Sequence, residues 1–129
     1  MKVLTLSIKQ KWFDEIVEGT KKCEYREVRP NNFARYCRYV HDGKEYVKYE
    51  DVPDDGKDCC VKPLKYDALK LVTGAYKEKR PYIVIAVTDA KLILYHDDKG
   101  EPIIYEHEGQ EYVRGDIEYH LGEIIEKYP

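Results

Sequence analysis

Apolar and polar positions follow two different periods in the first part of the chain. Residues 2–8 (KVLTLSI) largely alternate between apolar and polar side chains, which is typical of a strand with one buried face. Residues 9–18 then carry apolar side chains three and four positions apart, which predicts an amphipathic helix. We expect this helix to pack on a sheet through Trp12, Phe13, Ile16 and Val17. It should end at Gly19, because glycine readily adopts the left-handed conformation of a helix C-terminus.

The next segment predicts a strand over residues 22–28 (KCEYREV), which Pro30 should end because proline has no backbone N–H to donate to a sheet. A short helix is expected to open at Asn31 or Asn32. Residues 41–63 are polar and hold turn signals such as HDG and DVPDDG. They predict an extended loop excursion, with a small hairpin near residues 46–49.

The remaining half of the chain is dominated by strand signals. Residues 66–73 and 117–127 predict strands, residues 82–95 (YIVIAVTDAKLILY) are rich in β-branched side chains, and a hairpin is expected about Gly109. One helix followed by many strands indicates an α+β fold with a mostly antiparallel sheet of five to seven strands. In so short a chain we expect this sheet to curl into a small barrel, and residues 1–129 to form a single domain.

Composition narrows the class of protein. Charged residues make up 36% of the 129 positions and hydrophobic ones 43%, which fits a soluble globular protein. There is no apolar run near the ~20 residues that span a bilayer, and the start lacks the apolar region of a secretory signal. A cytoplasmic protein that does not enter membranes is therefore expected. Its four cysteines and four histidines show no zinc-binding spacing, so we expect reduced thiols, surface histidines, no metal and no cofactor.

Charge is unevenly distributed along the chain. Residues 1–40 hold nine Lys/Arg and five Asp/Glu, a balance of +4, whereas residues 91–129 hold four and ten, a balance of −6. The net charge of −3 argues against unspecific coating of nucleic acid, whose affinity grows with the number of phosphates neutralised. The basic first third still permits one local anionic or nucleotide ligand.

The most informative charged residues follow the first predicted helix. Because side chains alternate along a strand, Glu24 and Arg26 should share a face, and Lys21 on the preceding turn can reach the same patch. Such a cluster is either a solvated strand face or a polar site for the donor and acceptor edge of a base and its phosphate. Tyr76 and Arg80, in a second turn, are candidates for a stacking ring and a phosphate contact, or for an ordinary hairpin turn.

In this order, a strand, an amphipathic helix, Gly19-x-Lys21 and a strand with Glu24-x-Arg26 resemble the start of ASCH domains, a branch of the PUA-like superfamily. Softer similarity extends over residues 66–90 and 117–127, whereas residues 31–63 match no part of the pattern. The resemblance implies a small β-barrel flanked by helices, with a cleft beside the first helix. It also implies binding of RNA or of a modified nucleoside.

Three functions follow from these observations. The first is a binding module for RNA or a modified nucleotide, with Lys21, Glu24, Arg26, Tyr76 and Arg80 as ligand contacts. The second is an amidohydrolase of N4-acylated cytidine nucleosides. The resemblance places the family's catalytic lysine at Lys21, but Glu24 stands where the family has a threonine. The third is a protein-interaction scaffold that uses the tyrosine-rich residues 36–49 and the acidic C-terminal third.

Overall fold

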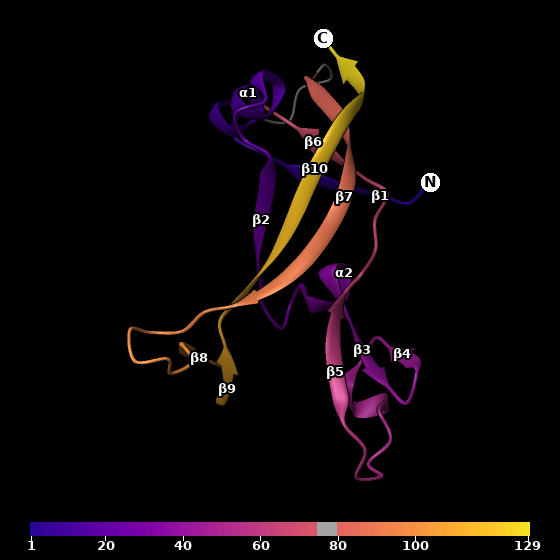
Figure 1. Ribbon diagram of the computed structural model, residues 1–129, viewed down its shortest axis with the longest axis vertical. Helices are drawn as coiled ribbons and strands as arrows, with labels where there is room; N and C mark the ends of the chain where they lie inside the picture. Colours follow the sequence, from indigo (N-terminus) through magenta and orange to yellow (C-terminus); the bar gives the residue numbers. More distant parts are fainter. Residues whose placement is uncertain (75–79) are drawn as a thin grey trace. The chain divides into compact units, whose positions relative to one another are not determined.

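The computed structural model describes residues 1–74 and 80–129, which form an α+β fold built mostly of strands (Figure 1). Its helices are α1 (Gln10–Glu18) and α2 (Phe33–Tyr36), with one 3-10 turn at Tyr49–Asp51. The strands are β1 (Val3–Ser7), β2 (Cys23–Val28), β3 (Cys37–His41), β4 (Lys44–Tyr46), β5 (Cys59–Pro63), β6 (Ala68–Val72), β7 (Tyr82–Leu94), β8 (Ile104–His107), β9 (Gln110–Val113) and β10 (Gly115–Tyr128).

These strands form three sheets rather than one barrel. Five of them are ordered β1-β6-β7-β10-β2, three are ordered β4-β3-β5, and β8 pairs with β9. A barrel requires its two edge strands to pair with each other, but β1 and β2 end the five-stranded sheet on opposite sides. The predicted barrel is therefore wrong. The barrel does not form because the strands within residues 37–63 and 104–113 pair in two small separate sheets. They add no strand to the five-stranded sheet.

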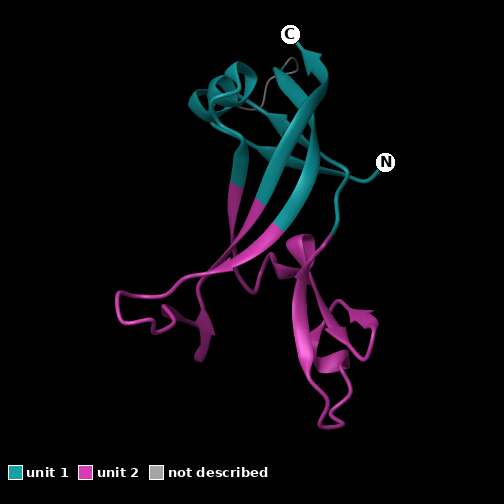
Figure 2. Ribbon diagram, in the orientation of Figure 1, with its two compact units in different colours: residues 1–24, 65–90, 119–129 teal, residues 25–64, 91–118 magenta. Residues whose placement is uncertain are grey.

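The chain divides into two compact units, each of which is built from separate segments (Figure 2). Unit 1 comprises residues 1–24, 65–90 and 119–129, and unit 2 comprises residues 25–64 and 91–118. Strands β2, β7 and β10 each contribute residues to both units.

The core of unit 1 follows the period of its strands. In β1, Leu4 and Leu6 are buried while Val3, Thr5 and Ser7 are exposed, as expected for an alternating strand. β1 pairs in parallel with β6, where Leu69 and Leu71 are fully buried opposite them. β7 then continues the sheet antiparallel to β6. The predicted strand at residues 82–95 is confirmed as β7, the longest strand but one.

Helix α1 buries a narrower stripe than its sequence predicts. Phe13 and Ile16 are buried, Val17 is half-buried, and Trp12 is 39% exposed. At 3.6 residues per turn, Ile16 and Phe13 lie at the middle of the apolar stripe, whereas Trp12 and Val17 lie at its two edges. The prediction that Trp12 packs into the core is therefore wrong.

Unit 2 contains two hairpins with similar turns. Asp42 and Gly43 join β3 to β4, and Glu108 and Gly109 join β8 to β9. Backbone φ is positive at both central residues of each turn, as a type I′ turn requires. The hairpin predicted about Gly109 is confirmed, whereas the one expected near residues 46–49 turns at residues 42–43 instead. Asn32 precedes α2, as its sequence suggests.

Candidate functional site

The turn after α1 is held in place by the end of the helix. Gly19 adopts a left-handed conformation (φ 84°), and its N–H and those of Thr20 and Lys21 donate to the last carbonyl groups of α1. The Lys21 N–H donates to the Glu15 carbonyl oxygen at 3.1 Å. On the other side, the Lys22 carbonyl oxygen accepts a hydrogen bond of 2.9 Å from the N–H of Leu121 in β10. The backbone of Lys21 is therefore fixed at the entrance to β2.

Lys21 and Glu24 form an ion pair in unit 1. The Lys21 Nζ lies 3.7 Å from the Glu24 Oε1, and the side chains are 18% and 8% exposed, respectively. Glu24 is thus one of the few buried charged residues among those described. A pair this sheltered from water is not a solvated strand face, and its carboxylate is screened less than a surface one. Of the two readings left open by the sequence, the solvated strand face does not describe this pair.

Trp12 lies beside this pair and was missed as a site residue. Its ring is 39% exposed, with the Lys21 Nζ 5.5 Å and the Lys11 Nζ 4.7 Å from the ring centroid. Helical spacing alone assigns Trp12 to the core, because tryptophan is apolar and lies four residues before Ile16. A signal was present in the adjacent Lys11, since a lysine next to an edge tryptophan can place its ammonium over the ring. We call Trp12, Lys21 and Glu24 the turn site.

The other predicted site residues are Arg26, Arg80 and Tyr76. Arg26 follows Glu24 on the same face of β2 and is half-buried, but it belongs to unit 2. Arg80 donates its Nε–H to the carbonyl oxygen of the buried Thr73 at 2.9 Å, which is a structural contact of the main chain. Tyr76 lies outside the described residues. The structure therefore brings together Lys21 and Glu24 and adds Trp12 to them.

One histidine differs from the sequence-based expectation. His41 is 3% exposed, and its Nε2 lies 2.8 Å from the Asp55 Oδ1, so the prediction of a surface histidine is wrong here. Hydrogen bonds lower the pKa of the Asp55 carboxyl. The largest effect comes from the Lys57 backbone N–H and the next from the His41 imidazole. Within residues 1–74 and 80–129, no three His, Cys, Asp or Glu side chains are grouped so that they could hold a metal ion. All four cysteines are outside disulfides.

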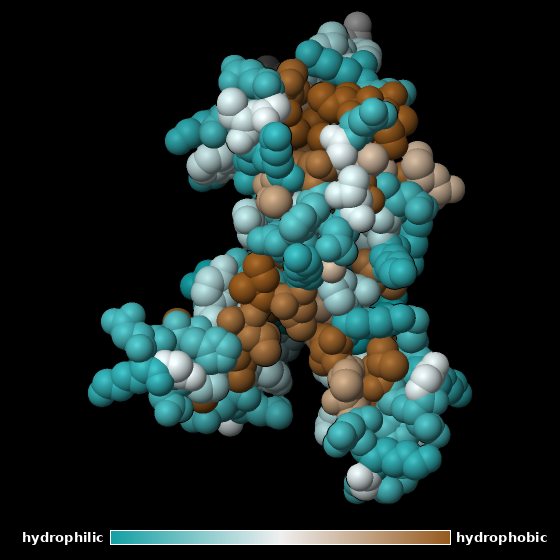
Figure 3. Space-filling view, in the orientation of Figure 1, coloured by the Kyte–Doolittle hydropathy of each residue, from teal (hydrophilic) through white to brown (hydrophobic). Residues whose placement is uncertain are grey.

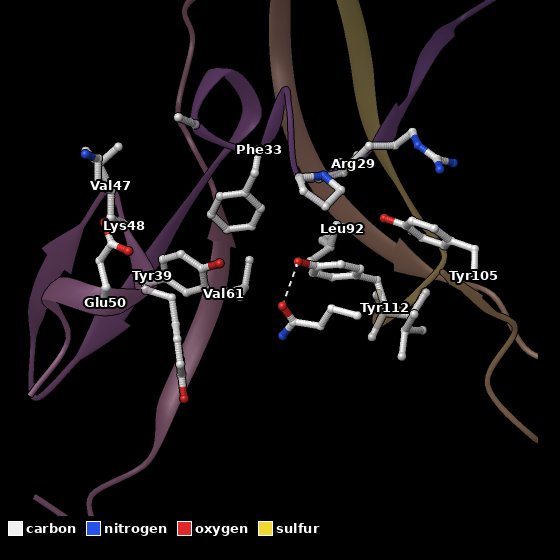
Figure 4. Close-up of a pocket in the computed structure, with 18 residues that line it drawn as sticks. Arg29, Phe33, Tyr39, Val47, Lys48, Glu50, Val61, Leu92, Tyr105 and Tyr112 are labelled. Carbon is white, nitrogen blue, oxygen red and sulfur yellow. Dashed lines mark hydrogen bonds between the residues drawn. The ribbon is translucent and has the colours of Figure 1, made fainter. Parts of the chain in front are cut away.

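Unit 2 holds a cavity of about 680 Å³ whose walls include five aromatic rings, and we call it the tyrosine pocket (Figure 4). Phe33 stacks on Tyr39 with 4.6 Å between ring centroids, and Tyr49 meets Tyr39 edge-on at 5.4 Å. Opposite them, Tyr105 and Tyr112 of the β8–β9 hairpin are stacked at 5.8 Å. A second cavity, of about 300 Å³, lies in unit 1 between α1 and residues near the C-terminus.

The tyrosine pocket joins two regions that are far apart in the sequence. Tyr39 and Tyr49 come from the tyrosine-rich residues 36–49, and Tyr105 and Tyr112 come from the acidic C-terminal third. Sequence reasoning assigned both regions to a protein-interaction scaffold but had no means of placing them in one cavity. No local spacing links residues more than fifty positions apart.

Comparison with known proteins supports the classification that the fold and the turn site suggest. A family model described as the ASCH domain matches residues 6–91, about two thirds of the chain. The chain therefore belongs to the ASCH domain family, within the PUA-like superfamily. PUA-like modules are generally associated with RNA binding. Searches of curated proteins and of solved structures gave no match. The family predicted from Gly19, Lys21, Glu24 and Arg26 is confirmed.

No helix among the described residues has both the length and the apolar character needed to span a membrane.

Proposed function

We propose that this ASCH domain binds single-stranded RNA or a modified nucleotide through the turn site. The observation that carries the proposal is the sheltered Lys21–Glu24 pair, 3.7 Å apart, beside the partly exposed ring of Trp12. An aromatic face, a carboxylate and a cation are the three groups needed to stack a base, accept a hydrogen bond from its amino group and contact a carbonyl or phosphate oxygen.

Each residue of the turn site has a distinct role in this proposal. Trp12 stacks on the base, which is expected to contribute about 1–3 kcal/mol. Glu24 accepts hydrogen bonds from an exocyclic amino group, and Lys21 contacts a phosphate or carbonyl oxygen through a charge-assisted hydrogen bond. Arg26 is proposed as a further cation on the same strand face. Tyr76 stays a proposed stacking ring and Arg80 a proposed phosphate contact, as the sequence pattern indicates.

The charge of unit 1 supports an anionic ligand. Its segments hold eleven Lys/Arg and nine Asp/Glu, a balance of +2, whereas those of unit 2 hold eleven and sixteen, a balance of −5. Phosphates are therefore expected to approach unit 1 more favourably than unit 2. The local excess is small, which predicts a site for a few nucleotides rather than tight binding along a duplex.

Trp12 offers a direct test because it is the only tryptophan in the chain. Short single-stranded RNAs and free nucleosides are titrated into the protein while Trp12 fluorescence is recorded, and the titration is repeated at several salt concentrations. We expect RNA to quench the fluorescence saturably, with an affinity that falls as the salt concentration rises. In Lys21→Ala the slope of log affinity against log salt concentration should be smaller in magnitude by about 0.7, as expected for one lost phosphate contact on a single strand. Exposed Lys91, outside the turn site, gives the matched control Lys91→Ala. The absence of salt-sensitive binding, or equal slopes in both variants, would refute the proposal.

A second candidate is hydrolysis of an N4-acylated cytidine nucleoside at the same position. It is favoured by one observation, the contact between Lys21, which matches the family's catalytic lysine, and the buried carboxylate of Glu24. Incubation with N4-acetylcytidine should then yield cytidine and acetate, and Lys21→Ala should abolish the reaction. If the wild-type protein releases neither product, this candidate is excluded while RNA binding is unaffected.

A further inference from the structure

The tyrosine pocket is walled by aromatic rings from two sides. Tyr39 and Tyr49 line one side and Tyr105 and Tyr112 the other, and Figure 4 shows the hydroxyl groups of Tyr39 and Tyr112 directed toward each other across the space between them. On the face of unit 2 seen in Figure 3, hydrophobic side chains also gather on both sides of a hollow. The cavity between the two sets of rings can therefore hold flat apolar groups, or the row of side-chain rings along an extended peptide.

Tyrosine hydroxyls add hydrogen-bond donors to these apolar walls. Burial raises the pKa of Tyr39 and that of Tyr105, so both phenols keep their protons at neutral and mildly alkaline pH. The Tyr112 hydroxyl donates to the Gln110 Oε1 at 3.2 Å, which leaves the amide N–H groups of Gln110 available as donors. The pocket thus combines apolar slots with donors, which suits a ligand rich in apolar rings and carbonyl acceptors.

The charge around the pocket favours a cationic partner. The β8–β9 hairpin, residues 104–113, contains three glutamates and no lysine or arginine. Residues 49–58, which begin at the opposite wall, contain five Asp/Glu and one lysine. Three charged side chains line the pocket itself, namely Arg29, Lys48 and Glu50. Arg29 is paired with Glu27 at 2.7 Å and lies 4.2 Å from the centroid of the Tyr105 ring, so its charge is compensated. A polyanion such as RNA would meet a unit with a balance of −5.

We propose that the tyrosine pocket is a docking site for a proline-rich peptide segment with flanking lysine or arginine residues. Such a segment is already extended as a polyproline II helix, with a ridge of pyrrolidine rings and no internal hydrogen bonds. Its rings fit slots between aromatic side chains, and its unpaired carbonyl groups accept hydrogen bonds from tyrosine hydroxyls. The basic flanks extend beyond the pocket, where the negative balance of unit 2 attracts them.

This activity is separate from the proposed RNA binding, because every residue that lines the tyrosine pocket belongs to unit 2, whereas the turn site belongs to unit 1. It also gives the tyrosine-rich and acidic segments one common role. Tyr49 is the most useful residue for a test, since it is 66% exposed and its truncation should leave the fold intact.

The test is a fluorescence anisotropy titration with a dye-labelled peptide of about twelve residues, with two prolines in P-x-x-P spacing and arginines at both ends. A peptide of the same composition, in which the prolines are scrambled out of that spacing, and a version with glutamate flanks serve as comparison ligands. We expect saturable binding of the first peptide and at least tenfold weaker binding of the other two. Tyr49→Ala should weaken binding by about tenfold, the loss typical of truncating a tyrosine that anchors a bound partner.

Two control variants separate this proposal from its alternatives. Tyr25→Ala removes a tyrosine of unit 2 that is 44% exposed and is not part of the pocket lining, and it should leave the affinity within about twofold. Lys21→Ala, in the turn site, should not alter peptide binding. The proposal is overturned if the wild-type protein does not discriminate the three peptides, if Tyr49→Ala and Tyr25→Ala bind equally, or if Tyr49→Ala weakens binding of a short RNA instead of the peptide.

Discussion

Cys37, the first residue of β3, should make the stability of the protein depend on alkaline pH. Its side chain is fully buried, and this burial raises the pKa of the thiol from the ordinary 9.0 to about 11, with Arg38 opposing the shift in part. A group with a raised pKa in the folded state contributes stability that is present below pH 9 and is lost as pH rises through about 11. The full loss for two pKa units is about 3 kcal/mol, of which about 1 kcal/mol falls between pH 8 and pH 10.

The assay is urea denaturation of the wild-type protein and of Cys37→Ala at pH 8 and at pH 10. The alanine variant lacks the ionisable thiol, so only the wild-type protein loses this contribution at high pH. The difference in free energy of unfolding between the two proteins should therefore shrink by about 1 kcal/mol from pH 8 to pH 10. Tyrosines whose raised pKa does not involve Cys37, such as Tyr95, destabilise both proteins alike at high pH and cancel in the comparison. Cys60→Ala, at an exposed position, should show no such change. If the wild-type protein and Cys37→Ala differ in free energy of unfolding by the same amount at both pH values, the assignment of a buried neutral thiol is refuted.

Three further outcomes follow from individual contacts. Tyr95→Phe removes the hydroxyl that donates to the Asp116 Oδ2 at 2.6 Å and leaves a carboxylate that is 8% exposed without this donor. It should cost about 1–3 kcal/mol in chemical denaturation, and full stability would contradict the contact. Gly19→Ala places a side chain at φ 84° with open space around it, so thermal melting should report a loss of about 1–2 kcal/mol from strain alone. Cys60 should react with a thiol reagent much faster than Cys37 in the folded protein, and equal rates would contradict the burial of Cys37.

Local periodicity predicts the elements of this fold well but not the assembly of its sheets. The alternation of Leu4 and Leu6 with polar residues, and the glycine at position 109, are sufficient to place β1 and the β8–β9 hairpin. The pairing of strands depends on contacts between distant segments, which the period of a single segment does not encode. The main sheet therefore ends at β1 and β2, and the predicted barrel does not close.

Local sequence likewise predicts only part of the turn site. Lys21 and Glu24 are three residues apart, so helix-end and strand geometry bring them together. Trp12 reaches them only because it lies at the edge of the apolar stripe of α1, and the sequence does not reveal how wide the buried stripe is. The tyrosine pocket depends on packing between residues 36–49 and residues 105–112, which are more than fifty positions apart. Such a cavity has no counterpart in local sequence.

The central claim, that Glu24 serves ligand binding, is tested most directly by comparing two properties of a single variant. Glu24→Gln keeps the size of the side chain and removes its charge. RNA affinity, measured by Trp12 fluorescence, and melting temperature are determined for this variant and for the wild-type protein. Because a base amino group would lose a charged acceptor, we predict a loss of affinity of about tenfold. The sheltered Lys21 also loses its counter-charge, so a lower melting temperature is expected as well and does not by itself contradict the claim. A Glu24→Gln protein that melts several degrees lower yet binds RNA with unchanged affinity would contradict the claim, and the pair would then be structural.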